Sequence, residues 1–169
     1  MFVIKDSTHA KAPIERCFLL STSLEIVERE LGMKPVAGAD ATRTAGLVVA
    51  GDRIRWEGWQ LGMRHYHVSL ISEFEPYSFF QDKMIAGRFK FFSHDHEFTE
   101  IGGQTLMKDV IRFSMPFGML GRLAGKYIML PHIRGLMARR FNLLKRIAES
   151  DEWRNYLPEP AESRQKLSA

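Results

Sequence analysis

The sequence contains a single cysteine, Cys17, among 169 residues. One cysteine excludes an intrachain disulfide and a cysteine-based metal cluster. Its apolar neighbours Phe18 and Leu19 indicate a small core residue rather than a reactive nucleophile. A Gly-rich phosphate loop and a nucleophile elbow are also missing, so no motif indicates cofactor chemistry. We therefore expect no cofactor and no resident metal ion.

Long apolar runs are missing as well. No stretch reaches the ~18–20 uninterrupted apolar residues that cross a bilayer. The N-terminal segment MFVIKDSTHA lacks the charged region and long apolar core of a secretory signal. We expect a soluble, cytoplasmic protein.

Charge of either sign is moderate. Charged residues make up 26% of the chain, hydrophobic residues make up 45%, and the net charge is +4. These values are ordinary for a globular protein, and the basic excess is far below that of dedicated nucleic-acid binders. We therefore expect no nucleic-acid partner.

The length fits one domain with a sizeable core. We predict a single domain over residues 1–150. Residues 151–169 turn polar and contain two prolines, which indicates a loosely held C-terminal tail, with Trp153 and Tyr156 as possible anchors.

Secondary-structure signals follow a simple order. A strand is predicted over residues 2–8, and two short helices over 13–21 and 24–31, with Gly32 as the stop signal. Residues 32–46 indicate a loop or a ragged strand edge. Strands are then predicted over 47–50, 53–61, 64–75, 78–86, 89–100 and 105–114. The turns between them are short, so these strands should be antiparallel neighbours.

One long helix is predicted over residues 119–149. Pro131 should kink it, because proline removes a backbone hydrogen bond and clashes with the preceding turn. A sheet with one apolar face buries that face best by curving around this helix, which gives an α+β fold. A mostly apolar stripe recurs at three- and four-residue spacing: Leu120, Leu123, Tyr127, Leu130, Arg134, Met137, Phe141, Leu144 and Ala148.

The hairpin over residues 89–114 centres on Gly102 and Gly103. Glycine accepts the positive φ of a type I′ turn, which would place Ile101 opposite Gln104. Side chains alternate along a strand, so counting outward pairs His96 with Asp109 on a mostly apolar face. The same count sets Phe98 opposite Met107 and His94 opposite Ile111.

Three segments resemble the START-like superfamily, also called SRPBCC, which includes polyketide cyclases and lipid-transfer domains. They are APIERCF (12–18), AGRFKFFSHDHEF (86–98) and GGQTLMKDVIRFSMPFGMLGRLAG (102–125). The resemblance is to small bacterial proteins of the cyclase/dehydrase or CoxG-like type and covers residues 2–148. It implies a helix-grip fold, in which a curved sheet of about seven strands wraps around a long C-terminal helix and two short helices follow the first strand.

Such a fold implies a cavity between the sheet and the last helix that binds a small hydrophobic or amphipathic ligand, such as a lipid, polyketide or aromatic molecule. We place non-catalytic binding first. The alternative is a cyclase or dehydrase in which His96 and Asp109 transfer a proton; the same pair could instead be a satisfied structural contact. The remaining residues expected to line the cavity are Phe92, His94, Phe98, Met107, Ile111, Phe113, Met119, Leu123 and Tyr127.

Two other features leave alternatives open. Each of the His-x-His pairs, at 65–67 and 94–96, places two imidazoles on one strand face, but the spacing alone is a weak metal signal and the two strands are not adjacent. The long helix is basic, which indicates a solvated face or a surface that docks on a membrane or a partner. No feature indicates the oligomeric state. The basic residues are Arg122, Lys126, Arg134, Arg139, Arg140, Lys145 and Arg146.

Overall fold

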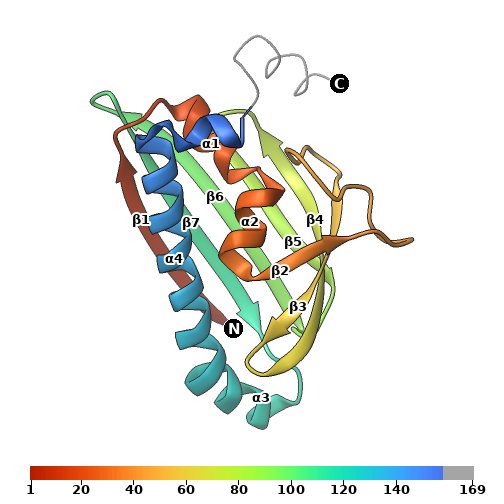
Figure 1. Ribbon diagram of the computed structural model, residues 1–169. Helices are drawn as coiled ribbons and strands as arrows, with labels where there is room; N and C mark the ends of the chain where they lie inside the picture. The colour runs from red at the N-terminus through yellow and green to blue at the C-terminus, as the bar shows by residue number, and fades with distance from the viewer. Residues whose placement is uncertain (158–169) are drawn as a thin grey trace.

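The chain folds as a curved antiparallel sheet with helices on one of its faces (Figure 1). This computed structural model describes residues 1–157; residues 158–169, which hold most of the predicted tail, lie outside the described part. The α+β helix-grip prediction is confirmed. The elements are β1 (Phe2–Ala10), α1 (Ile14–Ser21), α2 (Leu24–Leu31), β2 (Met33–Val36), β3 (Arg53–Gln60), β4 (Met63–Glu75), β5 (Phe79–Ala86), β6 (Phe91–Ile101), β7 (Gln104–Ser114), α3 (Gly118–Ala124), η1 (Gly125–Met129), α4 (Leu130–Glu149) and η2 (Asp151–Asn155).

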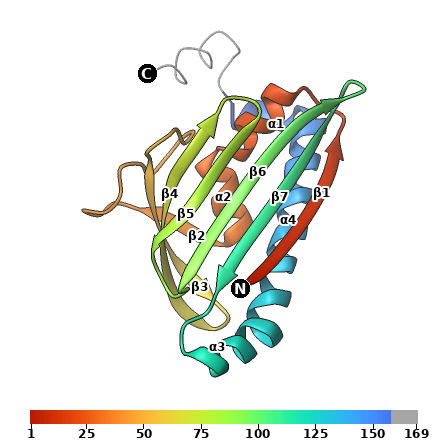
Figure 2. The ribbon, with the colours of Figure 1, turned by 180° about the vertical axis from the view of Figure 1, so that it is seen from behind.

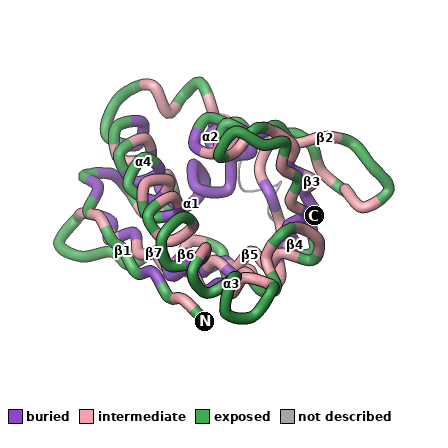
Figure 3. Tube along the Cα trace, turned by 90° about the horizontal axis from the view of Figure 1, so that it is seen from below, coloured by how far each residue is buried: buried purple, intermediate pink, exposed green. Residues whose placement is uncertain are grey.

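The strand order is β1-β7-β6-β5-β4-β3-β2. Figure 2 shows the convex face of the sheet, with α1, α2 and α4 behind it and α3 beyond its lower end. Seen from the end, the strands form a U, and α4 and α2 lie across its open side (Figure 3). Two register shifts interrupt the pairing of β4 with β5, and such bulges bend and twist strands.

Most element boundaries agree with the sequence within two residues. Gly32 ends α2 in the left-handed conformation, with φ of 64°. The edge strand β2 falls within the segment predicted as a loop or ragged edge. The strand predicted over residues 47–50 is wrong: only an isolated bridge joins Leu47 to Ser23, because that segment packs beside the start of α2 instead of extending the sheet.

The β6–β7 hairpin has the predicted register. Gly102 and Gly103 have φ of 58° and 74°, as a type I′ turn requires. His96 therefore lies opposite Asp109 on the concave face. This turn chemistry fixes the position of both polar side chains relative to the helices.

The long helix is not α-helical throughout. A π-helical turn, η1, lies just before Pro131, where proline cannot donate the usual backbone hydrogen bond. Two glycines, Gly121 in α3 and Gly125 at the start of η1, allow close approach to the rest of the fold. A Cβ on Gly121 would collide with the Pro116 carbonyl oxygen, and one on Gly125 would collide with the Phe2 ring. The glycines thus face the sheet, and the large side chains of α3 face outward.

The predicted helix stripe is therefore wrong in part. Leu120, Leu123 and Tyr127 are exposed, and so is Arg134. The extra residue of the π turn changes the phase of the helix, so the residues before it do not continue the buried face of α4. Arg140 joins that buried face, three residues after Met137. From α4 onward the buried face consists of Ile133, Met137, Arg140, Phe141, Leu144, Ile147 and Ala148.

Phe18 of α1 is the centre of the core at the end of the sheet nearest the β6–β7 turn. Its ring makes edge contacts with four aromatic rings, those of Phe74, Tyr77, Phe80 and Phe98. The C-terminal half of α4 packs into the same cluster. This end is therefore filled, and any internal space must lie toward α3.

The segment after α4 is held against the core. Trp153 and Tyr156 pack on the cluster around Phe18, and the Arg16 guanidinium lies 4.5 Å from the Trp153 ring centroid. Within residues 1–157, no helix is both long and apolar enough to span a membrane.

Candidate functional site

A cavity of about 420 Å³ lies between the concave face of the sheet and the helices α2, η1 and α4. Most of its lining side chains are apolar. It extends from the middle of the sheet to the end where η1 meets the β3–β4 hairpin. Representative apolar lining residues are Leu24, Ile54, Trp56, Ile71, Phe92, Ile111, Ile133 and Leu136.

A buried charged network forms one wall. Arg140 of α4 donates from Nε to Asp109 Oδ2 at 3.0 Å and from Nη1 to Glu30 Oε2 at 2.7 Å. All three side chains are at least 93% buried. Burial raises the pKa of Glu30, although Arg140 opposes the shift. The other Glu30 oxygen, Oε1, has no hydrogen-bond partner among the described residues.

His96 lies between two carboxylates. Its Nδ1 is 3.0 Å from Asp109 Oδ1, and its Nε2 is 3.4 Å from Asp82 Oδ2 on β5. The ring also stacks on Phe80, with centroids 4.1 Å apart. Both nitrogens of His96 thus face acidic oxygens, and the ring is held in place by packing.

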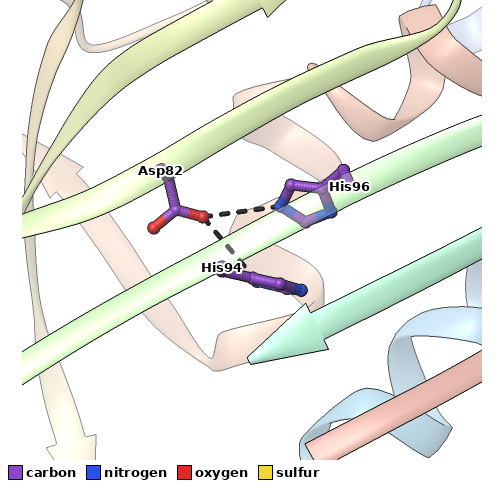
Figure 4. A group of neighbouring side chains, drawn as sticks. All are labelled: Asp82, His94 and His96. Atoms are coloured by element: carbon purple, nitrogen blue, oxygen red, sulfur yellow. Dashed lines mark hydrogen bonds and ion pairs between the residues drawn. The ribbon is translucent and has the colours of Figure 1, made fainter. Parts of the chain in front are cut away.

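His94 shares the same strand face, two residues earlier. Its Nε2 lies 3.1 Å from Asp109 Oδ2, but the angle is poor for a hydrogen bond, and within residues 1–157 that nitrogen has no hydrogen-bond partner. Its Nδ1 lies 3.7 Å from Asp82 Oδ2. Asp82, His94 and His96 therefore point toward one another within the cavity wall (Figure 4).

Burial and neighbouring charges set the protonation of this wall. Burial raises the pKa of Asp109, but His96 and Arg140 outweigh it and hold that pKa well below its ordinary value. Burial lowers the pKa of His96, and the Asp109 carboxylate more than offsets this, so the pKa of His96 is raised. Burial, and next the charge of His96, lower the pKa of His94. At neutral pH, Asp109 is ionised and His94 is neutral.

Further histidines surround the cavity. His67 Nε2 lies 3.0 Å from Ser69 Oγ, which in turn donates to Asp82 at 3.4 Å. His132 of α4 contacts Gln60 of β3 at 3.0 Å and links the helix to the β3–β4 hairpin. With His65, five of the six histidines of the protein line this one cavity. Such concentration is unusual for an otherwise apolar pocket.

The structure brings together five of the predicted site residues. His96 and Asp109 lie in contact, as the register predicted. Phe92, His94 and Ile111 line the cavity beside them.

The other six predicted cavity residues lie elsewhere, and these placements correct the prediction. Phe98 and Met107 belong to the filled end of the core under α1. Phe113 is fully buried and stacks on Phe2. Met119, Leu123 and Tyr127 are exposed, because Gly121 and Gly125 occupy the inward face of that helix. The later residues Met129, Ile133, Leu136 and Met137 line the cavity in their place.

Sequence reasoning missed three members of the charged wall, although each had a signal. Asp82 is two residues from Phe80 and so shares its inward face. Arg140 follows Ile133 and Met137 at helical spacing, and Glu30 follows Ile26 by four residues. A polar residue at an apolar position of the repeat was the common signal.

Comparison with family models and with curated proteins finds no match. Solved structures do match. Protein TTHA0849 from Thermus thermophilus has a TM-score of 0.67 at 17% identity, covering 86% of this chain and 95% of that one. Major latex-like protein 151 from Panax ginseng has a TM-score of 0.60 at 10% identity, with coverages of 88% and 98%. Aha1 from Colwellia psychrerythraea has a TM-score of 0.59 at 14% identity, with coverages of 88% and 97%.

At these identities the likeness concerns the fold. It extends over nearly the full length of each matched structure. The seven-stranded antiparallel sheet, the two short helices after β1 and the long C-terminal helix agree with it. The chain therefore has the helix-grip fold that its sequence predicts.

Proposed function

We propose that this protein binds a small, mainly apolar molecule in the cavity between the sheet and α4. One observation carries the proposal: a cavity of about 420 Å³ whose walls are mostly apolar and whose buried charges gather on one side. Ligand pockets generally combine an apolar lining with a few polar groups that fix orientation. A ligand with an apolar body and one polar end would match this distribution.

Binding is favoured over the cyclase or dehydrase alternative by the surroundings of His96. A general base needs a nitrogen that faces the substrate within hydrogen-bond reach. Both nitrogens of His96 face carboxylate oxygens instead, at 3.0 and 3.4 Å. We therefore assign the His96–Asp109 pair to the architecture of the binding wall.

A cavity-filling variant tests the proposal. Leu136 lines the cavity, so Leu136→Trp should displace ligand, whereas Ala138→Trp on the exposed side of the same helix should not. The measurement is native mass spectrometry of co-purified ligand, with titration of the fluorescent probe anilinonaphthalene sulfonate. We expect at least about a tenfold loss of probe affinity for Leu136→Trp alone. Equal probe affinity in the two variants and the unmodified protein would contradict binding in this cavity.

A second candidate function is docking on an anionic membrane. Phe117, Met119 and Leu120 are 85%, 79% and 75% exposed, although all three are large and apolar. They lie on α3 and its N-terminal flank, next to the β3–β4 hairpin at one end of the molecule (Figures 1 and 2). We call this the tip surface; its other exposed apolar members are Leu123, Tyr127, Ile128, Trp59, Leu61 and Met63.

The tip surface suits an anionic bilayer better than the basic helix face considered first. Arg140 of that helix is buried, and Arg146 is paired with Glu152. No acidic residue occurs between Asp109 and Glu149, and Arg122 and Lys126 lie within the tip segment. Clusters of exposed apolar side chains with basic neighbours are typical of membrane-surface binding.

The cavity reaches the tip surface, since Leu61, Met63 and Ile128 belong to both. A docked protein would thus present the cavity to the bilayer. Vesicle flotation tests this: we expect binding to phosphatidylglycerol-containing vesicles that weakens with salt. Absence of binding at low salt would overturn the docking proposal and leave the ligand-binding proposal intact.

A further inference from the structure

One carboxylate, Asp109, faces two imidazoles at once. Its Oδ1 lies 3.0 Å from His96 Nδ1, and its Oδ2 lies 3.1 Å from His94 Nε2. Arg140 holds this carboxylate through Oδ2. The hydrogen bond to Asp109 favours a proton on His96 Nδ1, to which Arg140 Nη2 also lies close at 3.3 Å, and leaves Nε2 of the neutral ring with a free lone pair. His94 Nε2 lies beside the same carboxylate without a hydrogen bond.

The second ring nitrogens of His96 and His94 converge on Asp82. His96 Nε2 is 3.4 Å from Asp82 Oδ2, and His94 Nδ1 is 3.7 Å from the same oxygen (Figure 4). One donor atom from each of the three residues lies within 4.8 Å of the others. Ligands at ~2.0–2.2 Å from a shared zinc ion in tetrahedral geometry are themselves about 3.3–3.6 Å apart. The two separations from Asp82 Oδ2, 3.4 and 3.7 Å, are close to that range.

We propose that Asp82, His94 and His96 form a binding site for a divalent transition-metal ion of the zinc or iron(II) class. Two imidazole nitrogens and one carboxylate oxygen are a donor set that such ions accept with coordination positions to spare. Asp109 orients the His96 imidazole from behind through its hydrogen bond to Nδ1, which is the usual arrangement around metal-bound histidine, and its other oxygen lies beside His94 Nε2. The remaining positions face the cavity, where a polar end of a bound molecule can reach the ion.

The charges of the wall also favour a bound cation. The wall holds three carboxylates, those of Asp82, Asp109 and Glu30, beside the guanidinium of Arg140. Buried negative charge without compensation is costly. A divalent cation beside Asp82 would balance the four charged side chains.

The competing arrangement contains no metal. His96 would then carry a second proton and bridge Asp82 to Asp109 as an imidazolium. That proton bonds His96 to Asp82 but makes no bond to His94, whose Nδ1 still faces Asp82 Oδ2 at 3.7 Å. The metal site and the bridging imidazolium make opposite predictions for metal titration.

The test uses the full-length chain without an affinity tag, stripped with a chelator and dialysed. It is titrated with Zn²⁺ by calorimetry and with Co²⁺ by visible absorption, which reports coordination geometry. We expect one ion per chain, and a loss of affinity of about 100-fold or more in Asp82→Asn and His94→Gln. The matched control is His132→Gln, which removes a histidine from the same cavity outside the proposed ligand set and should bind as the unmodified protein does.

Three results would overturn the site. They are no saturable Zn²⁺ or Co²⁺ binding by the unmodified chain, equal affinity in His94→Gln, and an equal loss in His132→Gln. Circular dichroism of each variant confirms folding, and if Asp82→Asn does not fold, His94→Gln decides. The site does not depend on the apolar ligand, since the probe is the metal alone.

Discussion

Arg140 reaches from α4 to Asp109 on β7, with Nε 3.0 Å from Oδ2, and both side chains are almost fully buried. The same guanidinium binds Glu30 on α2. One side chain of the last helix therefore ties together the sheet and the second short helix on the wall of the cavity. Arg140 is thus the guanidinium that both buried carboxylates share.

Removing this guanidinium should destabilise the fold strongly. Arg140→Met leaves two buried carboxylates without their cation, and breaking a buried ion pair from one side typically costs about 3–5 kcal/mol. Urea unfolding measures the change. The exposed neighbour Arg139 provides a matched control: Arg139→Met should lower the free energy of unfolding by less than about 0.5 kcal/mol. Similar losses in both variants would mean that the buried network does not hold the helices to the sheet.

Acid should destabilise the protein partly through His67. Burial is the largest influence on this residue and lowers its pKa to about 4, with Asp82 opposing and His65 assisting the shift. The folded state thus favours neutral His67, so the unfolded state takes up the proton first. The contribution of His67 to the free energy of unfolding is complete above about pH 6.5 and is lost as the pH falls toward 4.

His67→Gln should remove that contribution. As the pH falls from 7 to 4, the free energy of unfolding of the variant should rise by up to about 3 kcal/mol relative to that of the unmodified protein. Urea midpoints at a series of pH values measure the difference. His9→Gln is the control, since it removes a histidine that does not line the cavity. A parallel curve for His67→Gln would show that His67 titrates normally.

The thiol of Cys17 should be unreactive in the native state. It is 1% exposed, and burial raises the pKa of its thiol. We expect native protein to react with Ellman's reagent at least about 100-fold more slowly than unfolded protein, because the thiolate forms rarely and is inaccessible. Fast stoichiometric reaction of folded protein would contradict the packing of α1 against the sheet.

Phe117 should contribute to membrane binding and not to the stability of the fold. It is 85% exposed and has φ of +67°, a left-handed conformation that aromatic residues rarely adopt. Asparagine tolerates this conformation, so Phe117→Asn should leave the free energy of unfolding unchanged or slightly raised. We expect the variant to bind anionic vesicles at least about fivefold more weakly.

The control for Phe117 is an exposed apolar residue at the far end of the sheet. Ile101 lies beside the β6–β7 turn, and Ile101→Thr should retain vesicle binding. Equal loss in both variants would indicate general hydrophobic adsorption and not docking through the tip surface.

The sequence by itself determined the sheet and much of its register. Period-two alternation and short turns define antiparallel strands whatever their surroundings, and two glycines at 102–103 specify a type I′ turn. The pairing of His96 with Asp109 follows from local geometry alone. These signals are local, so they can be read from consecutive residues.

Only the tertiary structure decided what fills the concave face. The π turn before Pro131 changes the phase of the helix, so Leu123 is exposed, and Arg140 on the buried face of α4 meets carboxylates from the sheet and α2. Phe18 occupies the end of the core where Phe98 and Met107 were expected to meet a ligand. Asp82 and Glu30 join the same wall from elements far apart in the chain. Such convergence depends on packing between distant segments, because a helical or strand period identifies the inward face of each element but not which inward-facing residues meet.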